Sequence, residues 1–283
     1  MAVISGPPPY PHEQLVQPRP GDDVGFFTDS SICIGCKACE VACKQWNDVP
    51  VQVEDIRFLH TSYDNTGELN ANHWRHVAFI ERQRPDGSFM WLMNSDVCKH
   101  CKEAACLDVC PTGAIFHTEF DTVVVQADVC NGCGYCIPAC PFGVISRREG
   151  VASKPETNGI AQKCTLCYDR LSGGLEPACA QACPTKSIQF GPLTELRARA
   201  ERRVEALHAE GREEARLYLA GEADNGIGGT GSLFLLLDEP QAYGLPEHPV
   251  VPTRRLKGMW GAAAAAAGVV VAGLALALGS ARR

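Results

Sequence analysis

The sequence predicts an α+β fold built from two similar units with insertions, followed by one C-terminal transmembrane helix. Three observations predict it. All 16 cysteines of the 283-residue chain fall into four short groups. The segments between and after these groups show short β-branched runs and one clearly helical pattern, at 192–211. Finally, the 24 residues between Lys257 and Arg282 carry no charge.

The cysteine groups have the spacing of iron–sulfur ligands. The third group, "CNGCGYCIPACP", follows C-x2-C-x2-C-x3-C, the run with which bacterial ferredoxins hold a [4Fe–4S] cluster. The first group shares this spacing, and the second and fourth repeat it with a wider gap. Zinc, which usually binds two separated C-x2-C knuckles, is the less favoured metal, and cysteines at two-residue gaps do not favour a disulfide framework. The sequence therefore predicts four [4Fe–4S] clusters.

The fourth cysteine of each group is expected to bind the cluster of another group, as in two-cluster ferredoxins. The second and third groups are joined by a short turn-and-strand link, so they are expected to exchange fourth cysteines; by elimination, the first exchanges with the fourth. The fold class is then two ferredoxin-like dicluster units related by pseudo-twofold symmetry. The expected ligand sets are Cys33, Cys36, Cys39 and Cys183; Cys164, Cys167, Cys179 and Cys43; Cys98, Cys101, Cys106 and Cys140; and Cys130, Cys133, Cys136 and Cys110.

Four domains are expected along the chain. They are a proline-rich N-terminal arm at 1–24, a four-cluster ferredoxin-type domain at 25–191 with an insertion at 47–95, a helix-and-strand covering segment at 192–252, and a transmembrane anchor at 253–283. The arm is either an irregular segment lying on a neighbour or a disordered tail. Strands are expected at 76–82, 88–94, 122–126 and 232–238, with a turn at Pro85-Asp86-Gly87 between the first two.

The first cysteine group differs from the others at its end. Cys110, Cys140 and Cys183 are each followed by proline, whereas Cys43 is followed by Lys44. Proline favours an extended preceding residue and ends the local turn. The sequence therefore predicts a helix that carries Cys43 on past Lys44.

Two helices are expected after the cysteine groups. In 192–211, Leu196, Ala200, Val204 and Leu207 recur at helical spacing, Gly211 is a C-terminal stop, and the arginines are expected on a solvated face or in partner contacts. The uncharged segment near the C-terminus is long enough for the roughly 20 residues that cross a bilayer core. The alternative is a buried alanine-rich core helix.

Several other sequence features are weaker evidence of function. "GIGGTG" at 226–231 is expected to be a loop, because an apolar strand follows it where a dinucleotide site needs a helix. Surface or packing roles are expected for three histidines: His73, His76 and His100. Three lysines near the cysteines either moderate the charge of the clusters or are ordinary exposed lysines: Lys37, Lys99 and Lys163. No catalytic residues are expected, and the net charge of -7 without a long basic run excludes nucleic-acid binding as the main task.

A family resemblance rests on motifs spread from about residue 28 to the C-terminus. The chain resembles the iron–sulfur beta subunit of membrane-bound respiratory formate dehydrogenase in "CIGCKACEVACKQWNDV", "CIPACPFGV", "KCTLCYDR", "EPACAQACPT", "GGTGSLFLLLDEP" and "YGLPEHP". The resemblance implies a non-catalytic electron-transfer subunit with two partners. These are a molybdopterin-containing catalytic alpha subunit, with molybdenum or tungsten, and a cytochrome b gamma subunit that reduces quinone.

The resemblance also implies a location in the cell membrane with the globular part on the outer face, although positive charges at both ends of the span leave the cytoplasmic face open. Alternatives are the equivalent subunit of another molybdopterin oxidoreductase, of dimethyl sulfoxide reductase type, and that of a membrane-bound hydrogenase. A free soluble polyferredoxin and a zinc-bearing scaffold are further alternatives.

Overall fold

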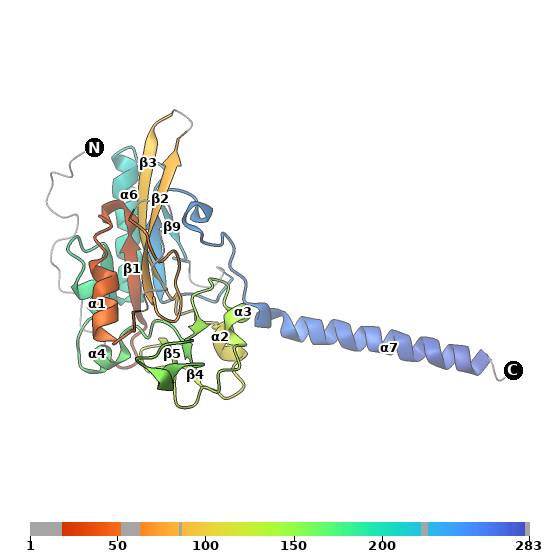
Figure 1. Ribbon diagram of the computed structural model, residues 1–283. Coiled ribbons are helices and arrows are strands. Elements are labelled where there is room, and N and C mark those ends of the chain that lie inside the picture. The colour runs from red at the N-terminus through yellow and green to blue at the C-terminus, as the bar shows by residue number, and fades with distance from the viewer. Residues whose placement is uncertain (1–18, 52–62, 85–86, 222–225, 281–283) are drawn as a thin grey trace.

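The computed structural model describes residues 19–280, apart from 52–62, 85–86 and 222–225 (Figure 1). Most of the predicted N-terminal arm and the first two residues of the predicted Pro85-Asp86-Gly87 turn therefore lie outside the described residues. Helices and strands alternate along the described chain, so the α+β class is confirmed. The pseudo-twofold relation and the four domain boundaries stay predictions.

A four-stranded mixed sheet forms the centre of the globular part, in the order β8-β1-β10-β9. β1 (Val24–Asp29) pairs in parallel with β10 (Ser232–Leu236) and antiparallel with β8 (Ile188–Pro192), and β10 pairs antiparallel with β9 (Arg216–Tyr218). Strand β10 confirms the prediction at 232–238, whereas β1, β8 and β9 were not predicted. The sheet joins segments that lie far apart in the sequence.

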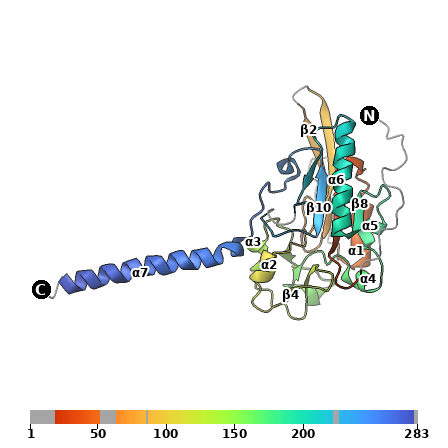
Figure 2. The same ribbon diagram turned by 180° about the vertical axis from the view of Figure 1, so that it is seen from behind.

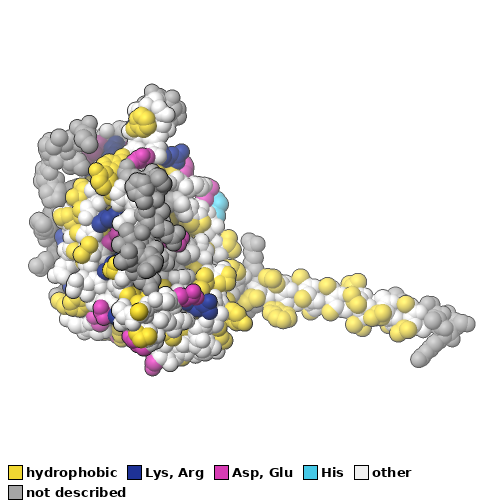
Figure 3. All heavy atoms as spheres, in the orientation of Figure 1, with side chains coloured by type: hydrophobic (Ala, Val, Ile, Leu, Met, Phe, Trp, Pro, Cys, Tyr) yellow, Lys and Arg dark blue, Asp and Glu magenta, His cyan; other side chains and the backbone are white. Residues whose placement is uncertain are grey.

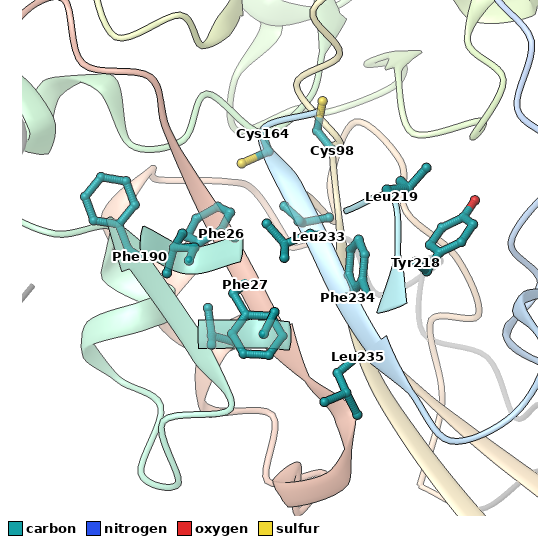
Figure 4. Close-up of a cluster of buried hydrophobic side chains, with 14 of the residues drawn as sticks. Phe26, Phe27, Cys98, Cys164, Phe190, Tyr218, Leu219, Leu233, Phe234 and Leu235 are labelled. Carbon is teal, nitrogen blue, oxygen red and sulfur yellow. The ribbon is translucent and has the colours of Figure 1, made fainter. Parts of the chain in front are cut away.

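Aromatic and aliphatic side chains from this sheet form the main core. Phe26, Phe27, Leu233 and Phe234 are completely buried, and Figure 4 shows the two phenylalanines Phe26 and Phe27 on β1 and the other two residues on the neighbouring strand β10. Burying each such side chain stabilises the fold by roughly 1.5–3 kcal/mol. Cys98 and Cys164 belong to the same buried cluster, so the sheet core continues directly into the cysteine-rich part.

Helix α6 (Leu193–Ala209) covers one face of the sheet (Figure 2). It confirms the predicted helix, with Leu196, Ala200 and Leu207 buried, and Gly211 follows its end with a positive φ of 82°. The expected solvated face is wrong for two arginines. Arg203 Nε donates to a carboxylate oxygen of buried Asp29 at 3.1 Å, and Arg199 donates to Gln189 at 2.8 Å, so both tie the helix to the sheet.

A long antiparallel hairpin leads into the second cysteine group. Its strands, β2 (Arg75–Gln83) and β3 (Phe89–Val97), confirm the strands predicted at 76–82 and 88–94 and are longer than expected. Two short hairpins flank the second and third groups: β4 (Ile115–His117) with β5 (Val123–Val125), and β6 (Ser146–Arg147) with β7 (Ala161–Gln162). Strand β5 confirms the run predicted at 122–126, while β4 was expected to be a turn.

Short helices carry the third cysteine of every group. They are α1 (Ala38–Trp46), α2 (Ala105–Asp108), α3 (Cys136–Ala139) and α5 (Ala178–Gln181), and α4 (Tyr168–Ser172) precedes α5. Single 3-10 turns are η1 (Ser30–Ile32), η3 (Pro155–Thr157), η4 (Pro240–Tyr243) and η5 (Pro252–Arg255). Helix α1 continues past Cys43 and Lys44, as predicted, whereas α2, α3 and α5 end before their Cys-Pro pairs and Cys140 is extended.

Helix α7 (Leu256–Ser280) projects away from the globular part (Figures 1 and 3). Its 25 residues correspond to about 37 Å at 1.5 Å per residue, more than the roughly 30 Å of a bilayer core. The window Gly258–Ala275 has a mean hydropathy of 1.7, and none of it is buried. The alternative of a buried core helix therefore does not describe this segment, and α7 is a candidate membrane anchor.

Candidate metal centres

All 16 cysteines lie in the described part of the chain, and every one is a free thiol. None is engaged in a disulfide, so all of them are available as metal ligands. Zinc needs four ligand atoms about 2–2.3 Å from one ion. Within the described ranges, no group of three or more His, Cys, Asp or Glu side chains converges in that way.

The first expected ligand set lines a cavity. Its walls include Cys33, Cys36, Cys39 and Cys183, so the first group and the last cysteine of the fourth group meet there. Val77 and Ile188 make the cavity apolar, and hydroxyls supply hydrogen bonds: Ser95 Oγ lies 3.3 Å from Cys39 Sγ. Four thiols around one cavity are the donor set that a [4Fe–4S] cluster binds.

The second expected set is brought together by helices α1 and α5, which pack on each other. Burial raises the pKa of Cys43 well above its usual value, and repulsion from the nearby thiols of Cys164, Cys179 and Cys167 adds to the effect. The amide nitrogen of Asn47 lies 3.7 Å from Cys43 Sγ and 3.8 Å from Cys167 Sγ. Cys43 is therefore close to the fourth group.

The cysteines of the third and fourth expected sets are also neighbours across their groups. Burial, followed by repulsion from Cys98, Cys106 and Cys140, raises the pKa of Cys101. The pKa of Cys136 rises to about 11 because of burial and of repulsion from Cys130, Cys133 and Cys110. Cys140 is thus a neighbour of the second group, and Cys110 a neighbour of the third.

Burial keeps several of these thiols protonated at neutral pH in the absence of metal. It raises the pKa of Cys39 and of Cys106 to about 12. A metal ligand has to be the thiolate, so binding releases these protons, and the resulting buried anions need a positively charged partner. In this interior, the cysteines are therefore stable as thiolates only when they bind metal.

The turn after a Cys-Pro pair directs hydrogen bonds at the cysteine. Burial favours a high pKa for Cys110, but hydrogen bonds from Thr112 and from the backbone N–H groups of Ile115 and Ala114 bring the pKa below its usual value. After Cys43, which has no proline, the helix continues and places Asn47 one turn further on, beside the sulfur. Asn47 was not recognised from the sequence as part of the site.

The buried cations Lys99, Lys163 and Arg75 lie beside the cysteine groups, and Arg170 is buried on α4, just after Cys167. Lys99 and Lys163 are 0% and 2% exposed, so their interpretation as ordinary exposed lysines is wrong. Their ammonium groups donate to the carbonyls of Val97 and Val123, respectively. The third cation, Arg75, was not recognised from the sequence. Lys37 instead lies nearer the surface and pairs with Glu40 at 3.5 Å.

The three histidines have packing roles. His73, His76 and His100 are all at least 95% buried. Nδ1 of His100 accepts a hydrogen bond from the backbone N–H of Val123 at 3.1 Å, and Nε2 of His76 lies 3.2 Å from a carboxylate oxygen of Asp64. These contacts agree with the expectation that the histidines are packed side chains.

The loop at 226–231 supports the second cysteine group. It is a loop followed by β10, as predicted, and it contacts the 98–103 segment through its backbone. Lys102 N donates to Gly229 O at 3.1 Å, and Gly231 N donates to Lys99 O at 2.9 Å. A Cβ at Gly228 would lie 2.5 Å from the side chain of Glu103. The positive φ of Gly228, 67°, and its tight contact with Glu103 explain a glycine at this position without phosphate binding.

The four expected sets follow one another in a single series. Cys39 interacts electrostatically with Cys179, Cys164 with Cys98, and Cys106 with Cys136. Figure 4 shows Cys98 and Cys164 side by side at the edge of the core. Two thiols are exposed, Cys36 and Cys133, and they belong to the two ends of the series. This arrangement defines a four-cluster, ferredoxin-type electron-transfer protein.

Comparison with known proteins agrees with this class. Two family models, each described as a 4Fe-4S dicluster domain, match residues 32–114 and 89–193. The chain is 40% identical over 235 residues to the nitrate-inducible formate dehydrogenase iron-sulfur subunit of Escherichia coli, covering 82% of this chain and 75% of that protein. It is 42% identical over 234 residues to the formate dehydrogenase iron-sulfur subunit of Haemophilus influenzae, covering 81% and 70%.

A second group of relatives matches a shorter part. The B subunit of the anaerobic dimethyl sulfoxide reductase of Escherichia coli is 39% identical over 173 residues, which are 61% of this chain and 75% of that protein. The chain belongs to the family of formate dehydrogenase iron–sulfur subunits. It is an electron-transfer subunit with four [4Fe–4S] clusters, and its relatives work as parts of larger oxidoreductase complexes.

Proposed function

We propose that this chain relays electrons from a catalytic subunit that oxidises formate to a membrane cytochrome b subunit and quinone. The observation that carries this proposal is the single series of cysteine sets, with an exposed thiol at each end. The choice of formate is supported by relatives at 40% identity whose names specify formate dehydrogenase. Each bound [4Fe–4S] cluster supplies a centre that accepts and gives one electron.

The residues of the chain hold the clusters and control their surroundings. The proposal keeps the four ligand sets expected from the sequence, and the cavity between Cys33 and Cys183 supports the first of them. Buried thiolates exclude water from the middle of the series, while hydrogen bonds to sulfur adjust the electron affinity of each site. We propose no catalytic residue on this chain; formate oxidation belongs to a partner with molybdenum or tungsten bound to a pterin.

The position of the anchor supports a direction of electron transfer along the four sites. Next to α7, the hydroxyl of Thr253 donates to Asp108 on α2, and Arg254 Nε lies 2.8 Å from a carboxylate oxygen of Glu103. The anchor therefore begins beside the second and third cysteine groups (Figures 1 and 2). Electrons enter near Cys36, from the catalytic subunit, and leave near Cys133, toward the membrane partner.

We propose that α7 crosses the cell membrane once and that the globular part lies on the outer face. The length of α7 and its exposed apolar window support the crossing. Protease treatment of intact cells tests the orientation. An outward-facing globular part is degraded without lysis, whereas protection in intact cells and degradation after lysis place it on the cytoplasmic face.

The experiment that tests the donor uses the intact complex, purified without oxygen. Adding formate is expected to bleach the visible absorbance of the clusters and to produce low-temperature EPR signals. Matched samples receive hydrogen gas, and pre-reduced samples receive dimethyl sulfoxide. Reduction by hydrogen but not formate indicates a hydrogenase partner, while oxidation by dimethyl sulfoxide without any response to formate indicates a partner of the dimethyl sulfoxide reductase type.

Single ligand substitutions test the exchange of fourth cysteines. Cys183→Ser is expected to alter the same EPR signal as Cys33→Ser, while Cys179→Ser alters a different one. If Cys183→Ser and Cys179→Ser change the same signal, the exchange is wrong. An iron content well below about sixteen per chain in anaerobically purified protein contradicts the four clusters.

A further inference from the structure

Arg75 is a buried cation with unusual surroundings. It is the first residue of β2 and is 2% exposed. Its Nη1 donates to the carbonyl oxygen of Ser95 at 3.3 Å and to the Ser95 hydroxyl at 3.2 Å. Its Nε and Nη2 are also buried, but they donate to no acceptor in the described part of the chain. On one side the guanidinium lies 4.7 Å from the ring centroid of Phe26.

The groups that act on Arg75 are cysteine thiols rather than carboxylates. Its strongest favourable electrostatic interactions are with the thiolates of Cys179, Cys39, Cys164 and Cys43. Cys39 belongs to the first proposed ligand set, and the other three belong to the second. Ser95 links Arg75 to the first ligand set, because its hydroxyl lies within hydrogen-bond distance of both Arg75 Nη1 and Cys39 Sγ. Arg75 therefore lies between two neighbouring sites of the series.

A buried charge without a partner is strongly unfavourable, so it is retained where a fixed opposite charge lies close by. A cluster held by four thiolates carries net negative charge, and reduction adds one more negative charge. Two N–H groups without a protein acceptor could donate to the inorganic sulfides of a bound cluster, and such hydrogen bonds stabilise the reduced form.

We propose that Arg75 is an electrostatic partner shared by the first two cluster sites, and that its fixed charge raises the reduction potentials of both. The inference rests on the proposed ligand sets. It deepens the proposed function, because it makes the first two centres better electron acceptors than their burial alone allows. A buried guanidinium keeps its charge at any ordinary pH, so the effect does not depend on titration of Arg75.

The test substitutes Arg75→Gln in the intact complex and measures each cluster by potentiometric titration with EPR. The equilibrium constant for one-electron reduction is expected to fall about tenfold or more at each of the first two sites. This corresponds to a decrease of about 59 mV or more in each reduction potential. The other two sites keep their potentials. Signals are assigned beforehand with Cys183→Ser for the first site and Cys43→Ser for the second.

Arg148→Gln is the matched control. Arg148 is also buried, at 3% exposed, and donates to Asn72 and to the carbonyl of Ala71. No cysteine is among the groups that shift its pKa, which burial lowers. Removing this charge is expected to leave all four potentials unchanged.

Each outcome decides the proposal. An assembled Arg75→Gln complex with unchanged potentials, or with an equal shift at all four sites, overturns it. If Arg75→Gln does not assemble its clusters, Arg75→Lys decides. If Arg75→Lys assembles its clusters, a positive charge is required at this position, which supports the proposal. If Arg75→Lys also fails to assemble them, Arg75 acts through packing and the proposal is overturned. Formate-dependent bleaching in the unsubstituted complex is measured separately, so the proposed function stands or falls independently.

Discussion

Gly35 offers a test of how tightly the first cluster loop is packed. It lies between Cys33 and Cys36 with a positive φ of 65°, and its N–H donates a hydrogen bond to the Cys33 sulfur. A Cβ at this position would lie 2.6 and 2.8 Å from two carbons of the Phe79 ring and 2.9 Å from Met93 Sδ. Gly35→Ala therefore has to displace the Phe79 ring and the Met93 side chain, or the loop itself.

The cost has two parts. A side chain at positive φ costs about 1–2 kcal/mol, and overpacking adds about 1–3 kcal/mol, so the substitution is expected to cost about 2–5 kcal/mol. Gly113 provides the matched control. It follows the Cys110-Pro-Thr turn with a φ of 68°, but a Cβ there meets nothing within 4 Å. Gly113→Ala is therefore expected to cost only the conformational part.

The assay is iron content together with low-temperature EPR of the reduced complex. Gly35→Ala is expected to lose the first cluster, about four of about sixteen irons per chain, while Gly113→Ala keeps all four. Adding Phe79→Ala to Gly35→Ala is expected to recover part of the loss, because it removes the ring that the new methyl group meets. Equal behaviour of Gly35→Ala and Gly113→Ala would refute the steric reasoning.

Three further predictions concern other contacts. Asn47→Leu removes the amide beside the Cys43 and Cys167 sulfurs. Loss of a hydrogen bond of about 1 kcal/mol is expected to lower the equilibrium constant for reduction of that cluster about fivefold, which EPR titration measures. An unchanged reduction potential argues against the contact. Arg203→Met removes the salt bridge to the fully buried Asp29 carboxylate, which keeps its hydrogen bonds from Ser31, and is expected to cost about 3–5 kcal/mol. This lowers the denaturant midpoint, and a similar decrease in the exposed Arg202→Met control contradicts it. Removing residues 256–283 from the chain produced without its partner subunits is expected to move it to the soluble fraction with its iron content unchanged. Continued membrane association of this shortened chain would show that α7 is not the anchor.

The helix at Cys43 shows what the local sequence can predict. The absence of proline after Cys43 predicted a helix past Lys44, and α1 does continue to Trp46. The prediction succeeded because the conformation after a cysteine depends on the next residue, which is part of the same local turn. The purpose of that helix could not be predicted, since Asn47 reaches Cys167 only through the packing of α1 on the fourth group.

Strand β1 shows the opposite case. "VGFFTD" at 24–29 is short and apolar, and nothing in its neighbourhood distinguishes it from a loop. It is central only because β10, from 232, and β8, from 188, pair with it on its two sides. Pairing between segments this far apart leaves no periodic signal in either segment.

The sequence by itself determined the cofactor chemistry, the number of clusters and the presence of a membrane-length helix, because ligand spacing and apolar length are local properties of a chain. Tertiary structure alone decided which charged side chains are buried. The sequence left open whether Lys99 and Lys163 are exposed or moderate the charge of the clusters. It placed Arg203 on a solvated face or in a partner contact, and Arg75 was not recognised at all. A long cationic side chain has the same sequence pattern whether it reaches water, a carboxylate or a thiolate. Only the folded arrangement determines which of these it meets.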